Sequence, residues 1–230
     1  MNNILIVSAT EAECAPALCE MEGCKTVYPC LYAGTLWGQP VEILISGIGS
    51  VAATFRLTQT MMQRSYSRVI SIGIAGSFTE DISIGETVQI TEDCFADLGI
   101  DNNGQFRSLR EEGLISDDVD GAFIINPSPI PSPHRKLRGI TVQTASGSKQ
   151  RINELVGRFN PQVETMENAA FFYVCHKLQV PFASFRAISN NVELRNRKNW
   201  QIDKAIDGVY KTLADLLRNE KKYLGYLSCS

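Results

Sequence analysis

Short apolar runs alternate along the chain with longer stretches that are apolar on one side only, and this alternation predicts strands followed by helices. Runs rich in valine and isoleucine are typical of buried strands. The expected buried strands cover residues 3–8, 67–76, 86–91, 139–145 and 181–189. Around the turn Trp37-Gly38-Gln39-Pro40, two further runs at 31–36 and 41–46 predict a hairpin.

Helical patterns fill most of the intervals between these strands. Thr10 is a candidate N-cap, with Glu13 at capping-box spacing, for a first helix that ends near Glu22. Residues 162–178 are expected to form a strand that leads into a helix. The other expected helices lie at about 50–63, 148–158 and 200–222.

Strands and helices that alternate in this way favour an α/β protein with a mixed sheet, and we expect one domain over residues 1–230. Residues 92–136 have the least regular pattern. Their proline- and serine-rich part, 126–134, is expected to be an exposed loop, because a strand pattern follows it at once.

Composition narrows the class of protein. Hydrophobic residues make up 44% of the chain and charged residues 20%, as in globular proteins with a proper core. The net charge of −3 gives no broad electropositive surface, so we expect no nucleic-acid partner. The apolar run at 4–9 is too short for a signal sequence or a membrane span, so we expect a cytoplasmic protein without membrane contact.

The potential metal ligands are few and scattered. The seven cysteines form no CxxC pair, and the only histidines are His134 and His176. Structural zinc sites need clustered cysteine or histidine, so we expect neither a metal nor a disulfide framework.

In α/β sheets, ligands gather at the carboxyl ends of strands. Glycine-rich stretches at 46–50 and 73–77 follow or end two strands, and they suit either close approach of a ligand or a tight turn. Glu13 and Glu167 stand at expected helix starts, where a carboxylate serves either a site or the helix dipole. Asn190 ends the last strand.

Taken in order, six segments resemble the nucleoside phosphorylase/nucleosidase superfamily. Within it, the chain is most similar to the families of methylthioadenosine/S-adenosylhomocysteine nucleosidases and of futalosine hydrolases. The segments are SATEAEC (8–14), SGIGSVAA (46–53), GIAGSF (73–78), IGETV (84–88), ETMENAA (164–170) and VPFASFRAISN (180–190). The resemblance implies a three-layer α/β/α fold with a central mixed, twisted sheet, a homodimer, and no cofactor.

The same resemblance implies the chemistry. These enzymes break the N-glycosidic bond between a purine and a ribose through an oxocarbenium-like transition state. Glu13 would position the attacking water, Met166 would pack under the ribose, and Glu167 would bind its hydroxyls. The nucleosidases have an aspartate after the RAIS segment, and this chain has Asn190 there.

Asn190 bears on the identity of the base. A 6-oxopurine presents two acceptors, N7 and O6, and a carboxamide NH₂ can donate to both. A protonated aspartate suits a 6-aminopurine instead. Mispairing a buried polar edge costs roughly 1–3 kcal/mol. Asn190 therefore favours hypoxanthine or guanine, and futalosine carries hypoxanthine. The segments ADLGID (96–101) and NVELRNRKNW (191–200) also resemble the futalosine hydrolases.

Other parts of the pocket follow from the same resemblance. Arg195 and Arg197 are candidates to bind the carboxylate on the 5′ extension of futalosine. The backbone around three pairs or groups of residues is expected to line the nucleoside pocket. These are Ser46, Gly47, Ile48 and Gly49; Ala75 and Gly76; and Gly147 and Ser148.

Hydrolysis is favoured over phosphorolysis. The segments 8–14 and 46–53 contain no arginine for a phosphate, and Glu13 would repel that anion. Three alternatives stay open from the sequence. They are a methylthioadenosine/S-adenosylhomocysteine nucleosidase, a 6-oxopurine nucleoside phosphorylase, and a catalytically silent nucleoside-binding protein.

Overall fold

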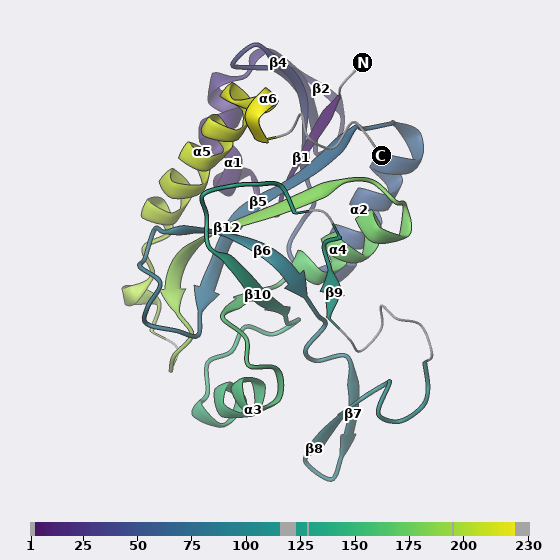
Figure 1. The fold of residues 1–230 in the computed structure, drawn as a ribbon, viewed down its shortest axis with the longest axis vertical. Coiled ribbons are helices and arrows are strands. Elements are labelled where there is room, and N and C mark those ends of the chain that lie inside the picture. The colour runs from purple at the N-terminus through teal and green to yellow at the C-terminus, as the bar shows by residue number, and fades with distance from the viewer. Residues whose placement is uncertain (1–2, 116–122, 128, 195, 224–230) are drawn as a thin grey trace.

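The computed structural model describes residues 3–115, 123–127, 129–194 and 196–223. Within them, a mixed sheet runs through the molecule and carries helices on both faces (Figure 1). The helices are α1 (Glu11–Glu20), α2 (Ser50–Gln63), α3 (Lys149–Phe159), α4 (Asn168–Lys177), α5 (Ile202–Arg218), α6 (Glu220–Tyr223) and the 3₁₀ helix η1 (Arg197–Asn199).

The main sheet has the strand order β11-β10-β6-β12-β5-β1-β4-β3-β2, and β9 pairs with β6. The end of β5 also pairs with β11, so five of these strands close on themselves at one end of the sheet. The strands are β1 (Ile4–Ser8), β2 (Glu22–Tyr28), β3 (Leu31–Leu36), β4 (Gln39–Ile45), β5 (Arg68–Ser77), β6 (Thr87–Asp93), β9 (Ile124–Ile125), β10 (Lys136–Thr141), β11 (Val163–Thr165) and β12 (Phe182–Asn191).

The central strand β1 shows why the chain forms three layers. Successive side chains of a strand point to opposite faces of the sheet. Ile4 and Ile6 join a core under α1 and α5, whereas Leu5 and Val7 join a second core under α2 and α4. A strand that is covered on both faces needs a continuous apolar run, which is the pattern of residues 4–7. The expected α/β/α fold with a mixed sheet is confirmed.

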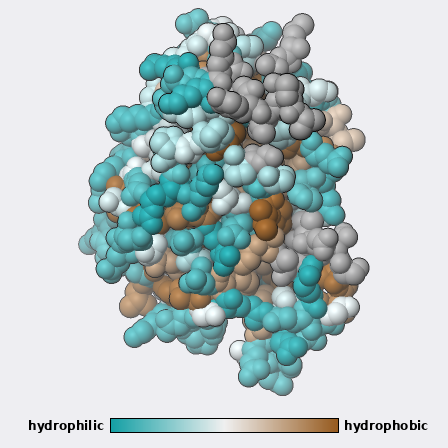
Figure 2. Space-filling view, in the orientation of Figure 1, coloured by the Kyte–Doolittle hydropathy of each residue, from teal (hydrophilic) through white to brown (hydrophobic). Residues whose placement is uncertain are grey.

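The long helix α5 covers one face through a single apolar stripe. Its buried residues recur at helical spacing and leave the charged residues outside. They are Ala205, Val209, Thr212, Leu213, Ala214, Leu216 and Leu217. The face of the molecule in Figure 2 is accordingly mostly hydrophilic, with smaller hydrophobic patches near its middle.

Several expected boundaries agree with the structure. Helix α2 begins at Ser50 and ends at Gln63, as expected. Thr10 caps α1, since its hydroxyl oxygen accepts from the backbone N–H of Glu13 at 3.3 Å. The first helix nevertheless ends at Glu20, because strand β2 starts at Glu22. This edge strand is largely exposed and polar, so it has no apolar period that would predict it.

Residues 92–136 contain structure that the sequence pattern did not predict. Strands β7 (Gly99–Asn102) and β8 (Gln105–Ser108) form a hairpin below the main sheet (Figure 1). Asn103 and Gly104 both have positive φ, as the Asn-Gly turn of a two-residue hairpin requires. The expectation of an exposed loop at 126–134 is wrong in part. Asn126 and Ile130 are buried, and the Asn126 amide donates to the carbonyl of Phe182 at 2.8 Å.

Candidate active site

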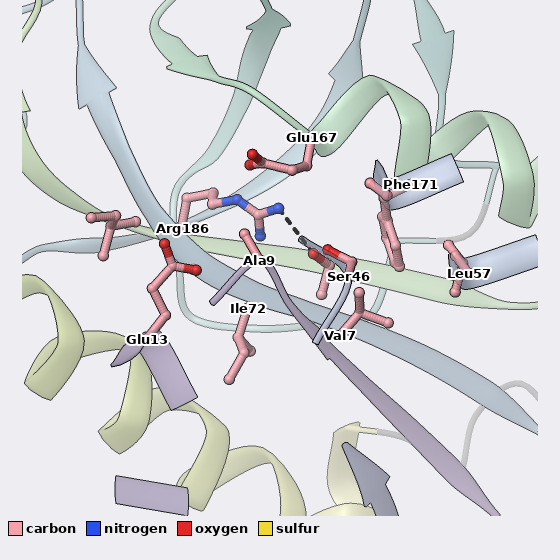
Figure 3. A pocket seen from close by; sticks show the side chains of 13 residues that line it. Val7, Ala9, Glu13, Ser46, Leu57, Ile72, Glu167, Phe171 and Arg186 are labelled. Carbon is pink, nitrogen blue, oxygen red and sulfur yellow. Dashed lines mark hydrogen bonds between the residues drawn. The ribbon is translucent and has the colours of Figure 1, made fainter. Parts of the chain in front are cut away.

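A small cavity lies where the ends of β1 and β4 and the middle of β5 and β12 meet α1, α2 and α4 (Figure 3). Polar and charged side chains project into it from α1, β5 and β12, from the residue that follows β4 and from the residue that precedes α4. Its lining consists of Val7, Ala9, Glu13, Ser46, Ala53, Leu57, Ser71, Ile72, Gly73, Ile74, Glu167, Phe171 and Arg186. The cavity therefore brings together Glu13 and Glu167, the two glutamates that the sequence singled out, which lie 154 positions apart in the chain.

Arg186 lies at the centre of this site, between the carboxylates of Glu13 and Glu167 (Figure 3). Its side chain is buried in β12. One guanidinium nitrogen, Nη2, donates to the hydroxyl of Ser71 at 2.9 Å, and Nη1 donates to the carbonyl of Phe185 at 2.9 Å. Burial lowers the pKa of Arg186, but the two glutamates oppose that effect, and an arginine stays protonated in proteins.

Glu13 is held in the cavity by the start of α1. Besides its backbone contact with Thr10, its carboxylate accepts a hydrogen bond from the Ser8 hydroxyl at 3.3 Å. Burial raises its pKa to about 7, although the charge of Arg186 acts in the opposite direction. A carboxylate with a pKa near neutrality is well matched to take a proton from water.

Glu167 directly precedes α4, and its carboxylate does not cap that helix. Its Oε1 accepts instead from the backbone N–H of Gly49 at 2.8 Å. Gly49 has φ +87°, a conformation that glycine adopts without strain, and this places its N–H toward the cavity. Burial raises the pKa of Glu167, while the Gly49 hydrogen bond and Arg186 lower it.

Asn190 lies four residues beyond Arg186, at a bulge where β12 pairs with β5. Its Nδ2 donates to the carbonyl of Asn191 at 2.9 Å, and the Ser189 hydroxyl donates to its Oδ1 at 2.8 Å. Gly76 is its neighbour on β5, and a Cβ there would lie 3.3 Å from Nδ2. Asn190 does not line the small cavity itself; it stands at the adjoining strand ends with Ala75 and Gly76.

The remaining expected residues are more dispersed. Ser46 lines the cavity, whereas Ile48 is 63% exposed and does not. Gly47 has φ +83° and packs closely against Ala52. Met166 precedes Glu167, and its carbonyl accepts from Ser50 at 3.3 Å.

Two further pairs belong to the expected pocket. Ser148, next to Gly147, caps α3 by accepting from the N–H of Arg151. Arg197 is exposed on η1. Arg195 lies outside the described residues. The substrate contacts of these four residues stay predictions.

Arg186 and its partner Ser71 were missed by sequence reasoning. The signal was present, because the strand 182–188 is apolar apart from Ser184 and Arg186, and an arginine inside such a strand is almost never fully buried without partners. The sequence does not show which partners those are. They come from strand β5 and from two helix starts that only the fold brings together.

The residues that the structure describes contain no cluster of three or more side chains suited to hold a metal ion. Within the same residues, no helix has both the length and the apolar character to cross a membrane. Six cysteines are described, and all six are free thiols.

The charge pattern of the cavity limits the chemistry that it suits. Two ionised carboxylates flank one guanidinium, so the site carries a net negative charge when both are deprotonated. Such a site repels a phosphate dianion and stabilises positive charge that develops on a bound group. A water molecule beside Glu13 would lie near a carboxylate that can accept its proton and near the positive charge that develops on the bound group.

The chain belongs to the phosphorylase superfamily, whose family model matches residues 3–219. The family membership expected from the six segments is thereby confirmed.

The similar proteins fall on two branches, the futalosine hydrolases and the 5′-methylthioadenosine/S-adenosylhomocysteine nucleosidases. A futalosine hydrolase of Thermus thermophilus is 27% identical over 190 residues, which cover 80% of this chain and 84% of that protein. A 5′-methylthioadenosine/S-adenosylhomocysteine nucleosidase of Shewanella oneidensis is 30% identical over 171 residues, which cover 69% and 70%. Among solved structures, a nucleosidase of the same kind from Colwellia psychrerythraea, in complex with adenine, has a TM-score of 0.80 at 19% identity and 94% coverage of both chains.

Proposed function

We propose that this protein is a nucleosidase that hydrolyses the N-glycosidic bond of futalosine and releases hypoxanthine, as a cytoplasmic step of menaquinone biosynthesis. One observation supports hydrolysis: Glu13, with a pKa near 7, lies in the same cavity as Arg186 and Glu167. Relatives on both branches are named as nucleosidases or hydrolases. A second futalosine hydrolase, of Acidothermus cellulolyticus, is 29% identical over 213 residues.

The reaction follows from the placement of these groups. Water held by Glu13 adds its oxygen to C1′ while the bond from C1′ to N9 breaks, and Glu13 takes the proton that the water loses. Glu167 binds the ribose hydroxyls. The positive charge that develops on the ribose is stabilised by the two carboxylates. The base leaves with the electron pair of the broken bond and is then protonated.

Asn190 is the residue that directs the proposal to a 6-oxopurine. The carbonyl of Asn191 can only accept, so it fixes Nδ2 on its side of the amide, and the Ser189 hydroxyl meets Oδ1. The group left to turn toward a ligand is thus a donor. Contact with both N7 and O6 requires the amide to exchange its bond to Asn191 for the base.

The 5′ extension of futalosine ends in a carboxylate. Arg197 is exposed in the segment that follows β12, and a guanidinium binds a carboxylate through two parallel hydrogen bonds. We assign Arg197, together with Arg195, to this group. The assignment is independent of the hydrolytic chemistry.

A homodimer is part of the proposal, because α2 presents an unusually apolar outer face. The exposed residues there and just before it are large and hydrophobic, namely Ile48 (63%), Val51 (81%), Phe55 (65%) and Met62 (71%). Contiguous apolar patches of this kind mark interfaces. Helix α2 begins next to Gly49, which contacts Glu167, so a second copy on this face would adjoin the site.

A panel assay tests the proposal. Purified protein is given futalosine, inosine and methylthioadenosine, each with and without phosphate, and the released base is identified by chromatography. We expect hypoxanthine from futalosine, with no dependence on phosphate. Adenine release from methylthioadenosine at an equal or higher rate would indicate the other nucleosidase branch. A requirement for phosphate would indicate a phosphorylase, and no release from any substrate would indicate a binding protein.

A further inference from the structure

A buried polar network lies directly behind the proposed active site and includes neither Glu13, Glu167 nor Arg186. At its centre is Asp93, the last residue of β6, which is fully buried. Its Oδ1 accepts from the hydroxyl of Thr141 at 2.8 Å, and its Oδ2 accepts from the side-chain amide of Asn168 at 2.8 Å. Gly139 makes room for it, since a Cβ there would lie 2.3 Å from Oδ2.

The network takes the place of the N-cap that Glu167 does not provide. The first backbone N–H groups of a helix need acceptors. The N–H of Asn168 donates to the Thr165 hydroxyl at 3.3 Å, and the N–H of Ala169 donates to the Thr141 hydroxyl at 2.7 Å. Because neighbouring strands cap α4, the carboxylate of Glu167 is left to face Gly49 and Arg186.

When its carboxylate is ionised, Asp93 sets the direction of every hydrogen bond in this network. An ionised carboxylate only accepts, so the single hydrogen of Thr141 points to Asp93. Thr141 must then accept from the Thr165 hydroxyl, 3.1 Å away, and from Ala169. Thr165 has given its hydrogen to Thr141, so its oxygen accepts from the N–H of Asn168.

The same network reaches the strand that carries Arg186. The Asn168 side chain donates to Asp93 and accepts from the Ser184 hydroxyl at 2.6 Å. Ser184 lies two residues before Arg186 in β12. The side chains of Asp93, Asn168 and Ser184 are all fully buried. Asn168 thereby links the first turn of α4 to both β6 and β12.

A buried carboxylate without a direct ion pair is costly to keep. Burial raises the pKa of Asp93 to about 7, although the hydrogen bonds from Asn168 and Thr141 lower it. Packing alone would be served by an apolar residue at this position. The Asp93 carboxylate instead holds Asn168, the residue that follows Glu167.

We propose that Asp93, acting through Asn168 and Thr141, is a positioning residue that holds the carboxylate of Glu167 beside Arg186 for the hydrolysis of the nucleoside. This inference rests on the proposed function for its kinetic consequences. The predicted position of the Glu167 carboxylate does not depend on which substrate the protein hydrolyses.

The test uses Asp93→Asn, Asn168→Asp and the double exchange of the two residues. In Asp93→Asn, two amides face each other, so the Asn168 amide must turn over to accept from position 93, and this reverses its hydrogen bond with Ser184. In Asn168→Asp, two carboxylates face each other. In the double exchange, the amide at 93 donates to the carboxylate at 168, which still accepts from Ser184, so each of these hydrogen bonds is restored. Ser184→Ala, which removes only the outermost link, is the milder variant if the single exchanges fail to fold.

We expect each single exchange to lower kcat for hypoxanthine release from futalosine by roughly 10- to 100-fold, as for lost orientation of an active-site group. The double exchange should recover to within about fivefold of the unchanged protein, and Ser184→Ala should lose roughly threefold to tenfold. Glu42→Gln is the matched control, because Glu42 is also a buried, hydrogen-bonded carboxylate but pairs with Arg64 and Tyr66 outside the site. It should lower stability and leave kcat unchanged.

Crystal structures of the single variants give a readout that needs no turnover. We expect the 2.8 Å contact between Glu167 and the N–H of Gly49 to be lost. If that contact stays, or if the double exchange is as slow as the single ones, Asp93 has no positioning role. If the unchanged protein releases no hypoxanthine, the proposed function fails, while the crystal structures still decide where Asp93 places Glu167.

Discussion

Replacing Glu13 by glutamine should stabilise the protein at alkaline pH. The substitution keeps the shape of the side chain and removes its charge. Burial raises the pKa of Glu13 from 4.5 to about 7, so the folded state holds this proton more tightly than the unfolded state does. Between these two values the folded protein binds more protons, and the free energy of unfolding must therefore fall as pH rises.

The magnitude follows from that shift. At roughly 1.4 kcal/mol per pH unit, a rise from 4.5 to about 7 corresponds to at most about 3.5 kcal/mol. The side chain keeps some contact with solvent, and screening reduces the expected effect to roughly 1–3 kcal/mol. Relative to the unchanged protein, Glu13→Gln should have a higher free energy of unfolding. This difference should be largest above about pH 7 and shrink as the pH falls toward about 4.5.

Urea denaturation at about pH 5 and about pH 8 measures this difference. Glu11→Gln is the matched control, because it removes a carboxylate from the same turn of α1 on the exposed side. An equal gain for Glu11→Gln would mean that charge at the helix start, and not burial in the cavity, causes the effect. A gain for Glu13→Gln that is the same at both pH values would refute the reasoning.

Three further outcomes follow from the same site. The kcat/KM for hypoxanthine release should fall as pH drops through about 7, because a protonated Glu13 cannot take a proton from water; a flat pH profile down to about pH 5 would exclude it as the base. Arg186→Lys should lower kcat roughly 10- to 100-fold, since an ammonium cannot reproduce the paired contacts to Ser71 and the Phe185 carbonyl; full activity would show that only the charge matters. Phe55→Glu should yield a monomer in sedimentation experiments, whereas an unchanged oligomer would place the interface elsewhere.

Much of the fold was predictable because its strands are buried on both faces. A strand such as residues 4–7 must be apolar at every position, and α5 must carry one apolar stripe, so both leave a clear pattern. Strand β2 and the β7–β8 hairpin leave none of this kind, because they are mostly exposed and take their conformation from pairing. For the hairpin, the Asn103-Gly104 turn was the available signal.

The site was predictable where a residue follows a strand, as Glu13, Ser46 and Glu167 do. Arg186 lies inside a strand, and nothing in its own segment says that two glutamates face it. The role inferred for Asp93 depends on contacts to residues 48 and 75 positions away. Contacts of that range exist only once the strand order is known.

The central claim is that the two N–H groups of the Asn190 amide recognise the base. A substitution at Asn190 tests this claim more directly than a substitution at any other residue. The measurement is the ratio of kcat/KM for futalosine to kcat/KM for its 6-amino counterpart, in the unchanged protein and in Asn190→Asp. One mispaired polar group costs roughly 1–3 kcal/mol, so the ratio should shift by roughly tenfold to a hundredfold toward the 6-aminopurine. A ratio that the substitution leaves unchanged would contradict the account, because the base would then be selected by other groups.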